Sequence, residues 1–337
     1  MRGGGGCGEG AGGGPAYRVG SMFAGIGGIC LAFRDAGAEM VWANELDHLA
    51  CETYRKNFGS EYLVEGDVRG IDPSSVPDMD VLTAGFPCQA FSVAGYRKGF
   101  GDDRGALFFE VVRMIGAKSP RAVLLENVKN LVGHDEGRTF ESVLQCLRGR
   151  GYSVAHAVLN SKDCGGVPQN RERVYIAAFR DPADMEGFAF PPPVPLEIGI
   201  RDVADPSVRG DPSLYYTEKS PIYAALDAAM GSPDSVYQWR RTYVRENKSG
   251  VCPTLTANMG GGGHNVPLIR DRFGIRKLSP EECLGFQGFP PGFAFAEMSA
   301  SHKYRQAGNS VSVPVVRRIA ENMILAMRRA DGRRPLS

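Results

Sequence analysis

Residues 17–32 read YRVGSMFAGIGGICLA, in which one apolar segment runs through a glycine-rich turn into another. The pattern predicts a strand over residues 17–22, a turn containing Gly25, Gly27 and Gly28, and then a helix. Glycines between a strand and a helix let the backbone pass close to a ligand lying over the helix N-terminus. Because the spacing differs from the G-x-G-x-x-G fingerprint, it disfavours a nicotinamide oxidoreductase and leaves a plain tight turn as the alternative.

Two acidic residues stand where the next two expected strands end. Residues 40–43 predict a strand that leads to Glu45, and residues 62–64 predict one that leads to Asp67. A carboxylate at the first position can accept hydrogen bonds from ribose hydroxyls, and one at the second can meet an adenine amino group. The three strand ends together predict a cofactor that contains adenosine. The alternative for Glu45 is a solvated surface charge.

A cysteine and a glutamate follow at the same expected edge of the sheet. The apolar run at residues 81–84 predicts a buried strand that leads into Gly85–Gln89, which reads GFPCQ. Cys88 is then either a nucleophile at the ligand-binding edge or a small core residue. The strand expected at residues 122–125 brings Glu126 to this edge, where a buried carboxyl group with a raised pKa can donate a proton. The alternative for Glu126 is a surface residue that caps a helix.

Two arginines and a glycine-rich loop complete the candidate site. Arg171 and Arg173 alternate just before a strand expected at residues 174–179, so the pattern points both side chains to one face. Guanidinium groups there can donate hydrogen bonds to a carbonyl oxygen or a phosphate. Residues 95–105 are rich in glycine and charge, which favours a loop that closes over a substrate.

Five segments together resemble the ordered motifs of the bacterial DNA (cytosine-5) methyltransferases. In chain order the segments are Phe23–Gly28, Gly85–Gln89, Glu126–Val128, Gln169–Arg173 and Gly308–Val311. The resemblance extends from about residue 17 to residue 330. It implies an α/β fold, in which a Rossmann-like S-adenosylmethionine-dependent methyltransferase domain has a mostly parallel sheet. It also implies a smaller, irregular target-recognition domain, with DNA held between the two.

The chemistry of cytosine assigns a role to each catalytic candidate. C5 of cytosine is too poor a nucleophile to take a methyl group from S-adenosylmethionine directly, so a thiolate, assigned to Cys88, first adds to C6. Protonation of N3 by Glu126 and a positive donor on O2, assigned to Arg171, ease this addition, and Arg173 completes the expected catalytic set. The base must first be flipped out of the duplex, at a cost on the order of a few kcal/mol.

The resemblance also implies the residues that bind S-adenosylmethionine. They are Phe23, Gly25, Gly27, Gly28, Glu45, Asp67, Pro87, Asn309, Ser310 and Val311. Many relatives have a tryptophan after the ribose-binding acid, whereas this chain has Leu46. Eight cysteines without a C-x-x-C pair, and five histidines that do not cluster with them, predict no metal site and reduced thiols.

A change in composition marks the expected recognition domain. The proline-rich segment Phe190–Pro195 predicts a stiff linker. Residues 237–245 alternate aromatics with arginines and predict either a DNA-reading strand or an ordinary half-buried strand with a basic face. The expected DNA contacts are Gln89, Ser92, Arg104, Arg240, Arg241, Thr254 and Thr256. The expected segments are a disordered tail at 1–16, a catalytic domain at 17–195 and 309–330, a recognition domain at 196–279 and a hinge at 280–308.

Two helices are expected after the recognition domain. Ser279, Pro280 and Glu282 form the pattern of a capping box with proline at the first helical position. Apolar residues recur at helical spacing over residues 316–327, which predicts a helix that returns to the catalytic domain and packs beside its first strand.

The composition of the chain limits where the protein is expected to act and what it is expected to bind. A hydrophobic content of 43%, no apolar run long enough to span a bilayer and no export signal predict a cytoplasmic protein of a bacterial or archaeal cell. A net charge of +1 requires that any DNA-binding surface be a local patch. The expected partner of this monomer is double-stranded DNA, with a restriction endonuclease acting on the same site without a stable complex. A transfer-RNA cytosine-5 methyltransferase and an inactive DNA-binding relative remain the alternatives.

Overall fold

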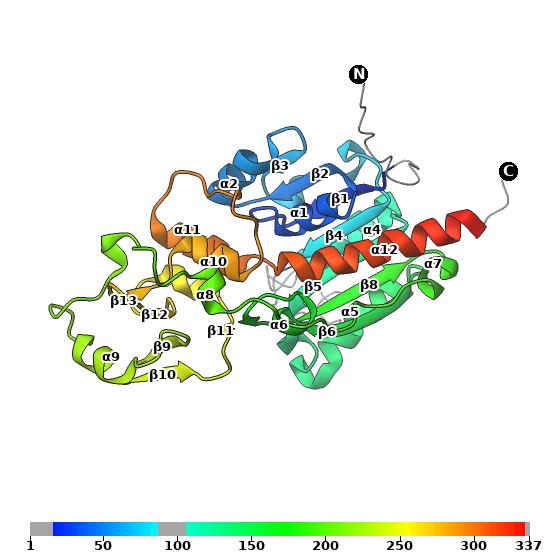
Figure 1. Cartoon of the computed structure of the whole chain (residues 1–337). Coiled ribbons are helices and arrows are strands. Elements are labelled where there is room, and N and C mark those ends of the chain that lie inside the picture. The colour runs from blue at the N-terminus through cyan, green and yellow to red at the C-terminus, as the bar shows by residue number, and fades with distance from the viewer. Residues whose placement is uncertain (1–15, 87–105, 334–337) are drawn as a thin grey trace, which may run out of the picture.

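The computed structural model describes residues 16–86 and 106–333. Its larger part is built on a seven-stranded sheet with the order β3-β2-β1-β4-β5-β8-β6 (Figure 1). Neighbouring strands from β3 to β5 are parallel, whereas β8 runs antiparallel to both of its neighbours. The expectation of an α/β fold with a mostly parallel sheet is therefore confirmed. The strands are β1 (Arg18–Met22), β2 (Glu39–Glu45), β3 (Leu63–Glu65), β4 (Val81–Gly85), β5 (Ala122–Val128), β6 (Ser153–Asn160) and β8 (Glu172–Phe179).

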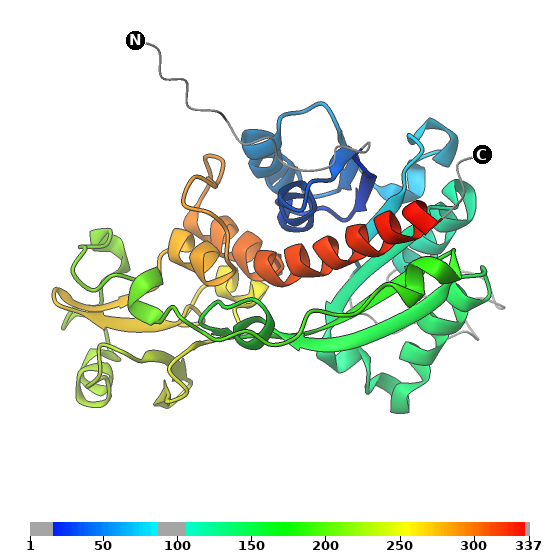
Figure 2. The ribbon, with the colours of Figure 1, turned by 45° about the vertical axis from the view of Figure 1, so that its right-hand side comes forward.

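Helices cover both faces of this sheet, because consecutive residues of a strand point to opposite sides. Val81 belongs to the core shared with α1 and α12, and its neighbour Leu82 belongs to the core shared with α4 and α5. Figure 2 shows the long helix α12 running across the sheet. The helices are α1 (Gly28–Asp35), α2 (His48–Phe58), α4 (Ala106–Lys118), α5 (Arg138–Arg148), α6 (Ser161–Cys164), α7 (Pro182–Glu186) and α12 (Val313–Arg333).

The expectation for the last helix needs one correction. Helix α12 returns to the part of the chain that carries the seven-stranded sheet, but it packs mainly against α1 rather than directly beside β1. The apolar stripe of α12 is buried against α1, α6 and α7 and belongs to the same core as one face of the sheet. No helix within the two described ranges is both long and apolar enough to cross a bilayer.

The smaller part of the molecule has a separate four-stranded sheet with the order β10-β9-β12-β13 (Figure 1). Its own small core includes Leu226, Tyr237 and Ile275. The single strand expected at residues 237–245 is instead a hairpin, because Arg241 adopts a left-handed conformation with φ 57° and reverses the chain. The elements are α8 (Ile200–Val203), α9 (Tyr223–Ala229), β9 (Val236–Arg240), β10 (Tyr243–Asn247), β12 (Leu268–Asp271) and β13 (Gly274–Lys277).

Two helices and a pair of very short strands join the two parts. The connecting elements are β7 (Gln169–Asn170), β11 (Cys252–Pro253), the 3₁₀ turn η6 (Ala257–Gly261), α10 (Pro280–Phe286) and α11 (Ala300–Asn309). Strands β7 and β11 pair in parallel although they lie far apart in the sequence. The turn η6 packs on α11. The smaller sheet is therefore tied to the larger part by backbone contacts at β11 and at η6.

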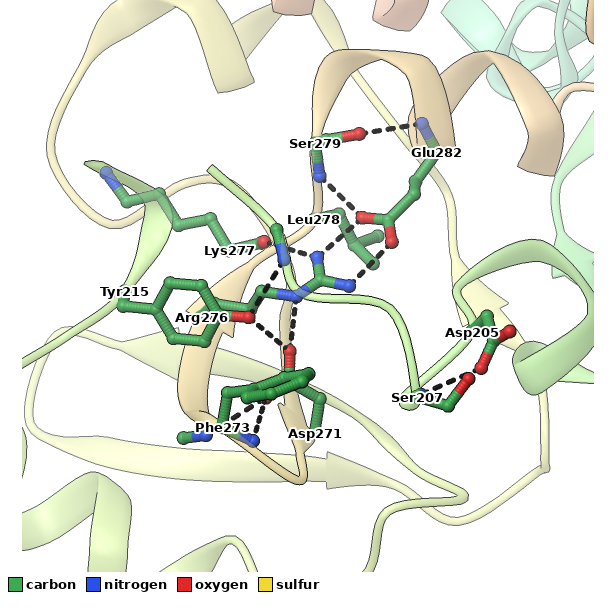
Figure 3. Close-up of polar contacts among 12 residues, drawn as sticks. Asp205, Ser207, Tyr215, Asp271, Phe273, Arg276, Lys277, Leu278, Ser279 and Glu282 are labelled. Carbon is green, nitrogen blue, oxygen red and sulfur yellow. Dashed lines mark hydrogen bonds and ion pairs between the residues drawn. The ribbon is translucent and has the colours of Figure 1, made fainter. Parts of the chain in front are cut away.

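A buried ion network fixes the start of α10 to the smaller sheet (Figure 3). Arg276 is 2% exposed and donates from both terminal nitrogens to Glu282 at 2.7 Å and from Nε to Asp271 at 2.8 Å. The Ser279 hydroxyl accepts from the Glu282 N–H while the Glu282 carboxylate accepts from the Ser279 N–H, so the predicted capping box is confirmed. The same glutamate thus caps the helix and holds the sheet.

Candidate active site

A cavity of about 510 Å³ opens at the carboxyl ends of the parallel strands. This is the edge at which open α/β sheets bind ligands. The expected site residues that line the cavity are Phe23, Gly25, Gly28, Glu45, Asp67, Glu126, Arg171, Arg173, Asn309, Ser310 and Val311. Gly27 is the one expected cofactor residue in the described ranges that does not line it. Pro87, Cys88, Gln89, Ser92, Arg104 and the whole expected loop at residues 95–105 lie outside the described residues.

The turn between β1 and α1 has an unusual backbone. Phe23 has φ 55°, which a residue with a side chain rarely adopts, and Gly25 and Gly27 have φ 56° and 92°. A Cβ on Gly25 would meet no atom within 4 Å, whereas one on Gly27 would lie 2.3 Å from the Phe58 ring. Gly25 is therefore open on the side where a ligand can approach, and Gly27 is required by packing of the turn.

Glu45 organises the rim of the cavity. Its Oε2 accepts from the Gly25 N–H at 2.8 Å, and its Oε1 accepts from the N–H groups of Leu46 and Asp47, each at 2.8 Å. A carboxylate has about four acceptor positions, so Glu45 retains capacity for one further donor. Leu46 lines the same rim and is 65% exposed. The solvated-charge alternative for Glu45 does not describe this position, because the carboxylate is bonded to three backbone donors.

Asp67 also lines the cavity, and it lies close to Glu45 because the preceding Gly66 N–H donates to the Glu45 carbonyl at 2.8 Å. Its carboxylate accepts from the side chain of Arg69 at 2.6 to 3.0 Å and from the Arg69 N–H at 3.0 Å. These hydrogen bonds lower the pKa of Asp67 below its usual range. Asp67 is therefore ionised near neutral pH and acts only as an acceptor there.

Another wall of the cavity is formed by Ser310 and Val311, which directly follow α11. A Cβ on Gly28 would lie 2.7 Å from the Ser310 hydroxyl oxygen and 3.0 Å from a methyl carbon of Val311. The glycine thus allows the start of α1 to contact residues 310–311 directly. His302, Arg305 and Gln306 also line this wall from α11. The sequence reasoning missed these three, since an amphipathic helix presents polar residues of this kind on ordinary surfaces too.

Glu126 lies at the end of β5, opposite Gly85 in the register of β4 and β5. The amide of the adjacent Asn127 donates to the carbonyl of Phe86 at 2.8 Å, which holds the end of β4 against β5. Burial raises the pKa of the Glu126 carboxyl, while the charges of Arg173 and Arg171 act in the opposite direction. Its side chain is 12% exposed. A carboxyl group in this setting is suited to hold a proton and donate it to a ligand.

The two arginines differ in what they contact. The Nε of Arg173 lies 3.3 Å from Oε1 of Glu126. Arg171 is 2% exposed, and its terminal nitrogens donate to the backbone carbonyls of Leu255 at 2.7 Å, Ser310 at 2.5 Å and Gly308 at 3.5 Å. Its Nε has no hydrogen-bond partner among the described residues. Burial, with Arg173 nearby, lowers the pKa of Arg171 to about 9, so the guanidinium stays protonated at neutral pH.

The expected DNA contacts of the smaller part occupy two different settings. Arg240 and Arg241 are exposed at the tip of the β9–β10 hairpin, and Arg240 donates to the side chain of Gln238 at 3.0 Å. The Thr254 hydroxyl donates to the carbonyl of Asn170 at 2.7 Å, so this threonine helps to attach its segment to β7. Thr256 is exposed. Within residues 16–86 and 106–333, no group of acidic, histidine and cysteine side chains is arranged to hold a metal ion.

Comparison with known proteins gives three findings. The sequence model of the family described as C-5 cytosine-specific DNA methylase matches residues 17–325. The Type II methyltransferase M.Bsp6I of Bacillus sp. (strain RFL6) is 54% identical over 313 residues, which cover 92% of this chain and 99% of that protein. The Type II methyltransferase M.HhaI of Haemophilus parahaemolyticus is 38% identical over 315 residues, which cover 90% of this chain and 92% of that protein.

A solved structure gives the same picture of the backbone. The crystal structure of a Spodoptera frugiperda DNMT2 mutant matches with a TM-score of 0.72 and covers 92% of this chain and 100% of that one. Its sequence identity to this chain is 18%, so the match supports the fold alone.

Proposed function

The chain belongs to the C-5 cytosine-specific DNA methylase family, and on that premise we propose that it methylates C5 of one cytosine within a short sequence of duplex DNA. The observation that carries the proposal is the position of Glu126. It stands at the carboxyl edge of the sheet with its pKa raised, beside Arg173, and the strand next to it leads into the segment that contains Cys88. An acid at this edge, with a cysteine three residues after the end of the neighbouring strand in the sequence, supports an attack by the thiol on an electron-poor ring.

The described residues of the cavity fit S-adenosylmethionine. Gly25 leaves open space beside a strained turn, Glu45 retains acceptor capacity at the position expected for ribose, and Asp67 lines the cavity with an ionised carboxylate that Arg69 holds in place. The cavity volume of about 510 Å³ lies within the range of small-molecule sites. We propose that these residues, with Phe23 and Ser310, hold the cofactor, which supplies the methyl group as an electrophile when it is bound.

The residues of this chain then act on the cytosine. We propose that the Cys88 thiolate forms a bond to C6 while Glu126 gives its proton to N3, so that the ring electrons move to C5. After C5 has received the methyl group, a base removes the C5 proton, the bond from C6 to Cys88 breaks and N3 returns its proton to Glu126, which restores the neutral ring and the acid. The raised pKa of Glu126 matches its role, because the proton must be present before the thiolate attacks.

The contacts of the two arginines favour a change in the role expected for them. Both terminal nitrogens of Arg171 are engaged by backbone carbonyls, whereas Arg173 donates from one terminal nitrogen to the Glu172 carbonyl and its Nε lies against Glu126 at the cavity. We therefore assign the donor on cytosine O2 to Arg173, beside the acid that serves N3. The Arg171 guanidinium instead binds backbone carbonyls of two other segments, at Leu255 and at Ser310.

We propose that residues 196–279 form the target-recognition domain and that DNA lies between this domain and the catalytic domain. The separate sheet and core of this segment, and the exposed arginines 240 and 241 on its hairpin, support the proposal. Arginine both reads guanine in the major groove and neutralises phosphate. The relatives named as Type II methyltransferases support a role in a restriction-modification system.

The deciding experiment is conversion-based sequencing of total DNA from cells that express this chain, beside cells that express Cys88→Ala. We expect 5-methylcytosine in one short motif with the parent protein and none with the variant. Cytosine methylation found only in transfer RNA would replace the proposed substrate. Methylation of DNA by both proteins would overturn the role of Cys88.

A further inference from the structure

The buried guanidinium of Arg171 contacts two segments that lie far apart in the sequence, one next to the smaller sheet and one at the cofactor cavity. It donates to the carbonyl of Leu255, in the segment that follows the β9–β10 hairpin, and to the carbonyl of Ser310, in the wall of the cofactor cavity. No residue from 252 to 256 lines that cavity. The side chain is 2% exposed, so these hydrogen bonds are made away from water and are correspondingly strong.

The segment around Leu255 is held on both sides of its backbone. Its N–H donates to the side chain of Gln169 at 3.1 Å, and its carbonyl accepts from Arg171 at 2.7 Å. The preceding residues 252–253 pair with β7, in which Gln169 lies. Residues 252–256, called the recognition segment below, are therefore bound to two side chains of the catalytic part, Gln169 and Arg171.

The two segments are also in direct backbone contact. A Cβ on Gly308 would lie 2.1 Å from the carbonyl carbon of Thr256 and 2.2 Å from its oxygen. With no side chain between them, the end of α11 cannot shift toward residue 256 without a clash. Gly308 also presents its carbonyl to Arg171 at 3.5 Å. The wall of the cofactor cavity and residues 252–256 are therefore packed against each other without a gap.

We propose that Arg171 is a positioning residue that couples DNA binding to cofactor binding, because its guanidinium holds the Leu255 and Ser310 carbonyls in one fixed relation. DNA that orders residues 252–256 then also orders the cavity wall, so that cofactor binding costs the protein less conformational entropy. Coupling of this kind is reciprocal, and each ligand raises the affinity for the other by the same factor. The inference rests on the proposed function, since it concerns the same two ligands.

The test measures that factor by calorimetry. The probes are S-adenosylhomocysteine, which cannot transfer a methyl group, and a duplex that carries the motif found by sequencing. In the parent protein we expect the duplex to raise the affinity for S-adenosylhomocysteine by roughly 5- to 150-fold. In Arg171→Lys, whose compact ammonium cannot span both carbonyls, we expect the factor to fall toward one.

Arg173→Lys is the matched control. It removes a guanidinium from the same strand segment and beside the same cavity, but not from Leu255 or Ser310, so it should keep the coupling factor of the parent protein while its methylation rate falls. An Arg171→Lys protein with the full parental factor would overturn the inference. So would a parent protein in which the duplex leaves cofactor affinity unchanged.

Hydrogen exchange in the unaltered protein gives a second test that does not depend on the folding of a variant. We expect S-adenosylhomocysteine alone to slow exchange in a peptide covering residues 251–256, which lie outside the cavity that binds it. Binding without any change in that peptide would overturn this inference and leave the proposed function intact. A protein that binds neither probe would overturn both.

Discussion

Replacing Gly308 by alanine should separate the recognition segment from the cofactor wall. The added Cβ would lie 2.1 Å from the Thr256 carbonyl carbon, so the two backbones must move apart by roughly 1.4 Å to reach an ordinary carbon–carbon contact of about 3.5 Å. No rotamer change relieves a clash with backbone. We therefore expect a loss near the upper part of the overpacking range, about 3 kcal/mol, against a gain in helix propensity of about 1 kcal/mol.

A second glycine in the chain provides the matched control for this change. Gly116 lies inside α4, and a Cβ there would meet no atom closer than 3.9 Å. Gly116→Ala should therefore stabilise the protein by about 0.5–1 kcal/mol, because it removes only the entropic cost of glycine in a helix. The same substitution in two helices should thus shift stability in opposite directions.

The assay is thermal unfolding of the parent protein and the two variants, followed by calorimetric titration with S-adenosylhomocysteine. Gly308→Ala should lower the unfolding midpoint by roughly 3 °C and weaken cofactor binding, whereas Gly116→Ala should raise the midpoint slightly and leave binding unchanged. A Gly308→Ala protein as stable as its parent would refute the reasoning, since it would mean that the contact with Thr256 is not tight.

Two further predictions concern buried carboxyl groups. The pKa of Glu126 is raised, so the folded protein holds this proton more tightly than the unfolded chain; the resulting stability is present at low pH and is lost as pH rises through the raised pKa. The unfolding free energy of the parent, measured by denaturant titration at several pH values, should therefore fall relative to that of Glu126→Gln as pH rises through this pKa. The same dependence of unfolding free energy on pH in both proteins would contradict the prediction. Glu282→Ala should cost about 3 kcal/mol, because it leaves Arg276 buried without its two-point partner, whereas the exposed neighbour Glu281→Ala should cost about 0.5 kcal/mol or less in the same titration.

The catalytic sheet could be predicted from sequence because each of its signals is local. An apolar run, a turn glycine and a polar residue at the strand end recur along the first half of the chain, and the strands observed at Arg18–Met22, Val81–Gly85 and Ala122–Val128 lie within a few residues of those expected. The capping box at Ser279 was predictable for the same reason, since all of its atoms lie within one helical turn.

What the sequence did not contain is the direction in which long side chains point. Alternation placed Arg171 and Arg173 on one face, and both do line the cavity, but only contacts between distant segments show that Arg171 is occupied by Leu255 and Ser310. The hairpin at residues 236–247 was missed because its reversal depends on a left-handed Arg241 rather than on glycine or asparagine. Thr254 likewise bonds to Asn170, a partner that no local pattern indicates.

The cofactor cavity is assembled from residues that the ribosome makes at very different times. One wall comes from Phe23 to Asp67 and the other from His302 to Val311, and α12 then covers α1. A nascent chain that has emerged only as far as Ala300 therefore has the sheet and the recognition hairpin but half a cavity. On the proposed function, the enzyme gains its methyl donor only after the segment that reads DNA has been synthesised.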